Sequence, residues 1–249
     1  MYNKTDLDPL VSFEKHIFHR DQFAHYLRWS FLLKETQGKE EIICDFWCWK
    51  WNMLEVLYRN RHKAKKYIWI DIRKSTIDNN KEKFKNIEWC EFISEDLVLN
   101  INNTKFENIK ADKVCSFEVI EHIWKNNADL FLQNMIKCWN NNATFYISTP
   151  NYDEKVGAAN NHTYDSWNWI EVQEFTHQEL EILFNKYFHI EKKYWTFASI
   201  KDYKDKMTES QKQMFEDLKK YYDVNLISVI FAPLFPEQSR NTLWILTKK

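Results

Sequence analysis

The feature that most constrains this chain is a regular alternation of strand-like and helix-like segments, which begins at Glu41. The strand-like segments are short and apolar, and they are Ile42–Phe46, Lys66–Ile70, Ile87–Phe92, Lys113–Phe117 and Thr144–Ser148. Helical spacing of apolar residues predicts the helices between them, which are Asn52–Asn60, Lys74–Phe84 and Ala128–Cys138. This order requires right-handed crossovers, so we expect an α/β fold, with a mostly parallel sheet and helices on both faces.

The segments that flank this alternation predict one domain with additions. Residues 8–35 have helical periodicity, and we expect residues 1–40 to form an N-terminal helical cap on a domain of residues 41–249. Residues 151–175 are polar and loop-like. Beyond them we expect a helix that a capping box starts at Thr176, an amphipathic helix, a sixth strand and its antiparallel partner. The last three are Lys206–Tyr222, Phe188–Thr196 and Thr242–Thr247.

The charge balance gives no global attraction to nucleic acid or to an anionic membrane. The formal net charge is -1, from 35 basic and 36 acidic residues, so such a partner requires a local patch. The densest basic run, Arg59–Lys66, is explained either by a solvated helix end or by phosphate contacts. No apolar run approaches the roughly 18 residues of a membrane span, and we expect no membrane partner.

The cysteines and the first residues indicate a reducing compartment. The five cysteines are scattered without a Cys-x-x-Cys pair, which favours buried thiols over disulfides or zinc. The segment Met1–Asp6 has no signal-peptide pattern. We therefore expect a cytoplasmic protein.

The stretch Ile42–Trp51 predicts a strand, a sharp turn and the start of a helix, the geometry that holds a nucleotide-like cofactor. Such a turn needs glycine, which reaches positive φ without steric cost and lets backbone N–H groups approach the ligand. Here tryptophan occupies positions 47, 49 and 51. The whole chain has 2 glycines and 12 tryptophans, whereas average usage of about 7% predicts roughly 17 glycines.

With glycine written at positions 47, 49 and 51, the turn reads Asp-Phe-Gly-Cys-Gly-Lys-Gly. This resembles the first motif of class I S-adenosylmethionine-dependent methyltransferases. Three later segments, Tyr67–Ile72, Ser94–Leu97 and Ser116–His122, resemble the next motifs of that family in order and spacing. The last has the form of ubiquinone-type and related small-molecule enzymes, and Ser148-Thr149-Pro150-Asn151 follows it. The resemblance covers about residues 40–195.

The resemblance implies a Rossmann-like fold with a seven-stranded sheet and S-adenosyl-L-methionine as cofactor. It implies that Asp71 grips the ribose hydroxyls and that Asp96 contacts the adenine amine. For Asp45, direct or water-mediated cofactor contact competes with a strand-end carboxylate that satisfies turn N–H groups. The cofactor-binding residues expected in this way are Asp45, Trp47, Trp49, Trp51, Asp71, Ile72, Asp96, Leu97 and Phe117.

Three interpretations compete for Glu118, Glu121 and His122, which would share one face if their segment were helical. They could shape the edge of the pocket without chemistry. His122 or Glu118 could instead act as a general base on an acidic acceptor proton, and we name both as catalytic candidates. Small-RNA 3′-end methyltransferases use a similar Glu-x-x-Glu-His and a later histidine for a divalent ion, which here would add His162. We expect no metal, with this set as the alternative.

The methyl acceptor is not readable from the sequence. A small molecule is favoured, and Tyr152–Asp165 is the candidate acceptor loop. An RNA methyltransferase and a non-catalytic binding module on the same fold are the alternatives. A nicotinamide-binding Rossmann enzyme fits less well, because its phosphate turn has Gly-x-Gly-x-x-Gly spacing.

The tryptophans sort into groups. Trp47, Trp49, Trp51 and Trp69 occupy family glycine positions, whereas Trp29 and Trp244 sit in ordinary apolar periodicity. Glycine would also fit the turn-like contexts of Trp124, Trp139, Trp167, Trp169 and Trp195. We hypothesise that UGA encodes glycine in the gene and was translated as tryptophan. The alternative is a degenerate pseudoenzyme. The written chain, with bulky indoles in the turn, is expected to bind the cofactor weakly or not at all.

Overall fold

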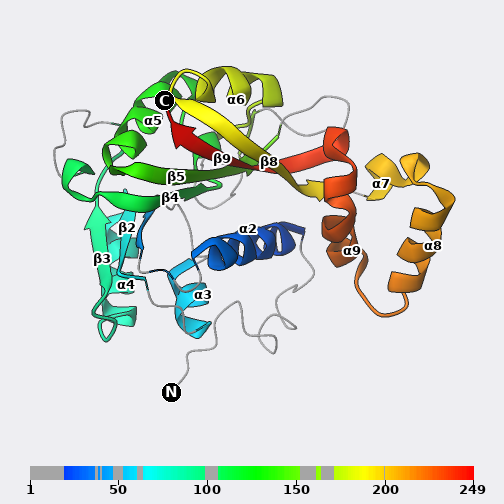
Figure 1. The fold of residues 1–249 in the computed structure, drawn as a ribbon, viewed down its shortest axis with the longest axis horizontal. Helices are drawn as coiled ribbons and strands as arrows, with labels where there is room; N and C mark the ends of the chain where they lie inside the picture. Colours follow the sequence, from blue (N-terminus) through cyan, green and yellow to red (C-terminus); the bar gives the residue numbers. More distant parts are fainter. Residues whose placement is uncertain are drawn as a thin grey trace.

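The computed structural model describes residues 20–36, 39, 41–46, 53–60, 64–98, 106–151, 161–163, 171–198 and 200–249. Its centre is a seven-stranded sheet with the order β3-β2-β1-β4-β5-β9-β8 (Figure 1). The strands are β1 (Ile42–Phe46), β2 (Lys66–Asp71), β3 (Cys90–Ser94), β4 (Ala111–Phe117), β5 (Trp139–Pro150), β8 (Phe188–Ala198) and β9 (Ser239–Lys248). The predicted α/β fold with a mostly parallel sheet is confirmed.

Strand direction follows the prediction. β1 pairs in parallel with β2 and β4, whereas β9 runs antiparallel to both β5 and β8. The predicted antiparallel pairing of the last two strands is therefore confirmed. β3 begins three residues later than the predicted start at Ile87, because turn hydrogen bonds from Ile87 N to Phe84 O and from Cys90 N to Ile87 O precede it.

Helices cover both faces of the sheet, as expected (Figure 1). The helices α2 (Arg20–Thr36), α3 (Met53–Arg59) and α4 (Lys74–Lys83) pack over one hydrophobic cluster that includes Trp29, Leu57 and Ile77. The helices α5 (Ala128–Lys137) and α6 (His177–Phe184) pack over another, which includes Phe131 and Leu180. The capping box predicted at Thr176 is present at the start of α6.

The helix α2 lies within the predicted N-terminal cap of residues 1–40, of which residues 1–19, 37, 38 and 40 lie outside the described residues. Among its described side chains, the buried ones are His25, Arg28, Trp29, Leu32 and Thr36, which recur at helical spacing. It packs against β8, α3 and the helix α9 (Val224–Phe231). Among the described residues, no helix is both long and apolar enough to cross a membrane.

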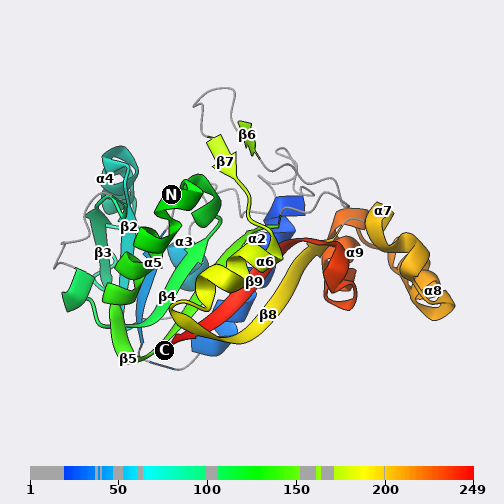
Figure 2. The ribbon, with the colours of Figure 1, turned by 90° about the horizontal axis from the view of Figure 1, so that it is seen from above.

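Three helices follow β8 and precede β9 in the sequence, and they project beyond the sheet (Figure 2). They are α7 (Ile200–Tyr203), α8 (Glu209–Leu218) and α9. They share a hydrophobic cluster that includes Tyr203, Phe215 and Phe231. The predicted helix Lys206–Tyr222 is thus present in shorter form as α8, and it packs on its own chain. From the predicted loop 151–175, the strands β6 (Asn161–Thr163) and β7 (Glu171–Gln173) form an antiparallel pair.

Candidate functional site

The carboxyl ends of the parallel strands bring the predicted acidic residues to one edge of the sheet. Asp45 is the penultimate residue of β1, Asp71 is the last residue of β2, and Glu118 directly follows β4. The register places Asp45 beside Trp69 on one side and Cys115 on the other. Ligands of open α/β sheets bind at this edge, at the point where the strand order reverses. In this sheet that point lies between β1 and β4, because β2 and β3 follow on one side and β5 on the other.

Asp45 is buried within the sheet, with 1% of its surface exposed. The hydroxyl of Tyr67 donates a hydrogen bond to its Oδ2. Burial raises the pKa of Asp45 to about 7; the Tyr67 hydrogen bond opposes this rise, and the nearby Asp71 charge adds to it. The other oxygen, Oδ1, is buried and has no hydrogen-bond partner among the described residues. Oδ1 of Asp45 can therefore accept a further hydrogen bond.

Asp71 has a similar half-satisfied carboxylate. Its Oδ1 accepts from the backbone N–H of Arg73 at 2.8 Å and lies 3.5 Å from Arg73 Nε. Its Oδ2 is buried and has no partner among the described residues. Burial raises the pKa of Asp71, and the contacts with Arg73 oppose that rise. Since a buried carboxylate oxygen without a donor is costly, Oδ2 is suited to a ligand hydroxyl.

The next predicted pair, Asp96 and Leu97, follows β3. Asp96 Oδ1 accepts from Val98 N at 2.8 Å, so it stabilises its own turn. Leu97 is partly buried against the core, and its carbonyl accepts from the side chain of Asn134. Of the other predicted cofactor contacts, Ile72 is 56% exposed beside Asp71, whereas Phe117 is buried in the core. Their cofactor roles stay predictions.

Glu118 forms the turn at the end of β4 in a left-handed conformation, with φ of 57°. Its backbone N–H donates to Ser148 O at 2.9 Å. Its Oε1 accepts from Ser148 Oγ at 3.1 Å and lies 3.2 Å from Arg28 Nη2. Its Oε2 accepts from Asn241 Nδ2 at 2.9 Å. Both carboxylate oxygens are thus engaged, and Glu118 joins three distant parts of the chain.

Glu121 and His122 follow in a single 3₁₀ turn, Ile120–His122, so the α-helical face considered for these residues does not form. Glu121 is buried, and Thr149 Oγ1 donates to its Oε2 at 3.0 Å. Burial, followed by the nearby Glu118 charge, holds the pKa of Glu121 well above its ordinary value. His122 Nε2 lies 4.0 Å from Glu121 Oε1, and its side chain is 22% exposed. His122 is therefore the more accessible of the two.

Within the part of the chain that the structure describes, no group of three His, Cys, Asp or Glu residues forms a metal-binding cluster. The side chain of His162 lies outside the described residues, so the alternative metal set is not tested.

Several predicted residues also lie outside the described residues. These include Trp47, Trp49 and Trp51, together with most of the candidate acceptor loop Tyr152–Asp165. Trp69, the fourth tryptophan at a family glycine position, is 2% exposed and packs at a tilt against Phe92, with 6.1 Å between ring centroids. The two tryptophans expected from ordinary periodicity, Trp29 and Trp244, are both buried in the core.

Sequence reasoning missed Arg28, Asn241 and Tyr67, which contact the predicted carboxylates. A signal was present for Arg28, because a charged residue interrupts the apolar face of the predicted N-terminal helix. Asn241 carried none, since it is 213 positions from Arg28.

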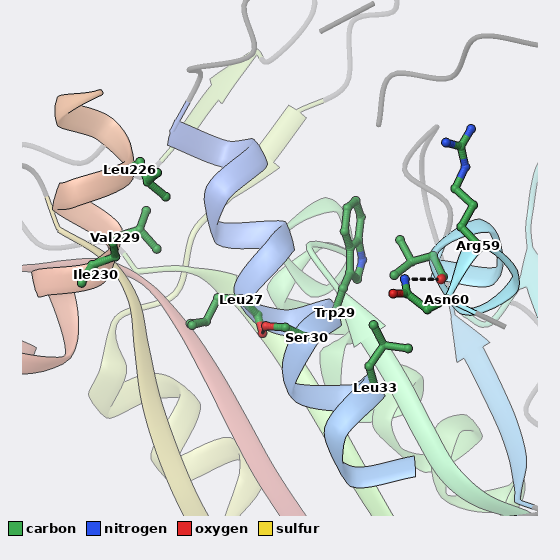
Figure 3. A pocket seen from close by; sticks show the side chains of 10 residues that line it. Leu27, Trp29, Ser30, Leu33, Arg59, Asn60, Leu226, Val229 and Ile230 are labelled. Atoms are coloured by element: carbon green, nitrogen blue, oxygen red, sulfur yellow. Dashed lines mark hydrogen bonds between the residues drawn. The ribbon is translucent and has the colours of Figure 1, made fainter. Parts of the chain in front are cut away.

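An apolar groove of about 540 Å³ lies between α2, α3 and α9 (Figure 3). Its walls include Leu27, Leu33, Val56 and Val229, with Arg59 also lining it. Among the predicted site residues that the structure describes, none lines this groove.

The fold is that of class I S-adenosylmethionine-dependent methyltransferases. No protein-family model and no curated protein matches the sequence. Among solved structures, the chain is similar to the methyltransferase domain of bacterial CtHen1-C, with 16% identity, a TM-score of 0.58, and 92% of this chain and 98% of that chain covered.

Two further similar structures contain S-adenosylhomocysteine. One is the O-methyltransferase from a trans-AT PKS multienzyme of Brevibacillus brevis, with 15% identity, a TM-score of 0.58, and 95% and 75% of the two chains covered. The other is the 1,6-didemethyltoxoflavin-N1-methyltransferase of Burkholderia thailandensis, with 11% identity, a TM-score of 0.55, and 95% and 89% covered.

Proposed function

We propose that the protein transfers a methyl group from S-adenosyl-L-methionine to a small-molecule acceptor. The observation that carries this proposal is Asp71 Oδ2, a buried acceptor oxygen without a described partner at the end of β2. In the motif that this segment resembles, the acidic residue accepts hydrogen bonds from both ribose hydroxyls. A carboxylate with one oxygen held by Arg73 and the other available fits that task.

The other carboxylates fit the remaining parts of such a cofactor. Asp45, with its pKa raised to about 7 and Oδ1 without a described partner, would receive a donor from the cofactor or from the turn that follows β1. Asp96, which directly follows β3 in the segment that resembles the acidic motif, would contact the adenine amine. The cofactor, when bound, supplies an electrophilic methyl group on a sulfonium. The chain's own task is to align the acceptor and to exclude water.

His122 is our candidate for the general base. Its side chain is partly exposed on the turn after β4, and an imidazole can take a proton from an acidic acceptor. Glu118 is less suited to that task, because Arg28, Ser148 and Asn241 already engage its oxygens. We therefore assign Glu118 to the shape of the pocket edge, the first of the three interpretations above.

RNA is the second candidate acceptor, because Glu118, Glu121 and His122 resemble the Glu-x-x-Glu-His of small-RNA 3′-end methyltransferases. The Glu/Glu/His metal site that would accompany it is opposed by the contacts that already engage both carboxylate oxygens of Glu118. A non-catalytic binding module would keep cofactor binding but transfer no methyl group.

A transfer assay distinguishes these functions. The protein with glycine at positions 47, 49, 51 and 69 is incubated with cofactor labelled in the methyl group, with fractionated metabolites and, separately, with RNA. We expect label in a small-molecule fraction. Label only in RNA with a divalent-ion requirement supports the second candidate, and binding without transfer in any fraction supports the binding module.

A further inference from the structure

We infer that Arg28, on helix α2, is a positioning residue for the turn that carries Glu118 and His122. The inference rests on the proposed function, because that function gives the turn its role beside the acceptor. It gives helix α2 a role at the candidate site in addition to its packing over one face of the sheet.

Arg28 is a buried cation whose two terminal nitrogens both have partners, whereas its Nε is buried and has no hydrogen-bond partner among the described residues. The residue is 1% exposed, and its Nη2 donates to Asn241 Oδ1 at 2.9 Å and lies 3.2 Å from Glu118 Oε1. Its Nη1 lies 3.2 Å from Nδ1 of His25. Burial, together with the Arg28 charge, holds the pKa of His25 well below its ordinary value, so His25 stays neutral and its Nδ1 can accept. A buried guanidinium requires a counter-ion, and Glu118 supplies it.

Asn241 completes a closed network around the same carboxylate. Its Oδ1 accepts from Arg28 Nη2 and from Thr196 Oγ1 at 2.8 Å, while its Nδ2 donates to Glu118 Oε2 at 2.9 Å. The network thus joins α2, the strands β8 and β9, and the turn after β4. Because the partners approach Glu118 from different elements, they restrict its carboxylate in more than one direction.

The turn needs such restriction because its backbone is unfavourable. A residue with a Cβ at φ of 57° persists only where the surroundings hold it. Ser148 holds the backbone N–H of Glu118, and the Arg28 network holds the carboxylate. The 3₁₀ turn that contains His122 starts two residues later. A change in Glu118 therefore moves the imidazole, and Arg28 acts on His122 through Glu118.

A double-mutant cycle in the chain with tryptophan at positions 47, 49, 51 and 69 tests the contact between Arg28 and Glu118. Arg28→Met, Glu118→Gln and the double variant are unfolded with urea, with Arg28→Lys as the conservative variant and Lys34→Met, exposed on the same helix, as the control. We expect each single change to lower the urea midpoint and the double change to cost clearly less than the sum. Arg28→Lys recovers part of the loss, and Lys34→Met shifts nothing. Additive losses would overturn the inference.

The positioning role is tested by the kinetics of the protein that carries glycine at positions 47, 49, 51 and 69. We expect Arg28→Met to lower kcat by about 10- to 100-fold with the KM for S-adenosylmethionine changed by less than about twofold, and Arg28→Lys to recover part of kcat. An unchanged kcat would contradict the inference. If the parent protein shows no transfer at all, the proposed function fails, and the unfolding cycle still decides whether Arg28 holds Glu118.

Discussion

The hydroxyl of Tyr67 on β2 donates a hydrogen bond to Asp45 on the neighbouring strand β1, where both side chains are buried. The carboxyl that receives this bond has its pKa raised to about 7 by burial. Because the ionised form of this carboxyl is penalised by burial, its protonation state should affect the stability of the fold.

The free energy of unfolding should therefore depend on pH through Asp45. The folded-state pKa is raised, so the stabilisation is fully present below the ordinary value of 3.8 and is lost as pH rises through about 7. The loss is on the order of 4 kcal/mol. Urea unfolding between pH 4 and pH 8 measures it. Asp45→Asn, which mimics the neutral carboxyl, should remove most of this dependence.

Asp129 provides the matched contrast. Partial burial is the largest single influence on the pKa of this carboxylate and raises it, but the hydrogen bonds from Lys186 and Tyr187, together with the Lys186 charge, lower the pKa overall. Its stabilisation is present above the ordinary pKa and is lost only as pH falls, so Asp129→Asn should leave the change between pH 4 and pH 8 intact. A pH dependence that survives Asp45→Asn unchanged would exclude Asp45 as its source.

Asp71 should contribute to cofactor affinity through its charge. In the protein with glycine at positions 47, 49, 51 and 69, we expect Asp71→Asn to weaken the binding of S-adenosylmethionine by about 10- to 100-fold, since hydrogen bonds to a charged acceptor contribute about 1.5 to 3 kcal/mol. Isothermal titration measures the change. Asp78→Asn is the control, because Asp78 is exposed and pairs with Lys74 at 2.6 Å. Equal affinities for Asp71→Asn and Asp78→Asn would refute the ribose role.

The capping box of α6 predicts a local effect on stability. Thr176 Oγ1 accepts from Glu179 N at 3.1 Å, and Glu179 Oε2 accepts from Thr176 N at 2.8 Å. We expect Thr176→Ala to lower the free energy of unfolding by about 1 kcal/mol and Thr176→Ser to have little effect. Urea denaturation of both variants is the measurement, and an equal loss in both would rule out the hydroxyl oxygen as the cause.

The codons of the tryptophans test the glycine hypothesis without any protein. We expect UGA at the codons for Trp47, Trp49, Trp51 and Trp69, and UGG at those for Trp29 and Trp244. The burial of Trp29 and Trp244 agrees with genuine tryptophans, although Trp69 is buried as well. Sequencing the gene decides the matter, and UGG at the four motif positions would end the hypothesis.

Local sequence patterns predicted the sheet well, because each parallel strand is a short apolar run of its own. β1 has the bounds predicted from the sequence, Ile42–Phe46, and α4 differs only at its last residue. The helix α9 was not predicted, since Val224–Phe231 is rich in β-branched residues and has no helical alternation. Propensity was overridden there by packing against α2 and β8.

The acidic residues of the candidate site were predicted from motif spacing, but their partners were not. Asp45 and Asp71 lie at the ends of predicted strands and Glu118 directly follows one, so chain order alone indicates a shared edge. Arg28 and Asn241 reach Glu118 from opposite ends of the chain. Such contacts arise from tertiary packing, and no local pattern encodes them.

The most direct test of the central claim is a calorimetric titration of S-adenosylmethionine into two proteins, the written chain and the variant with glycine at positions 47, 49, 51 and 69. We predict micromolar binding to the glycine variant and weak or no binding to the written chain. Micromolar binding to the tryptophan form would refute the claim that the indoles at positions 47, 49 and 51 compete with the cofactor for space. No binding to the glycine form would contradict the proposed methyltransferase function itself.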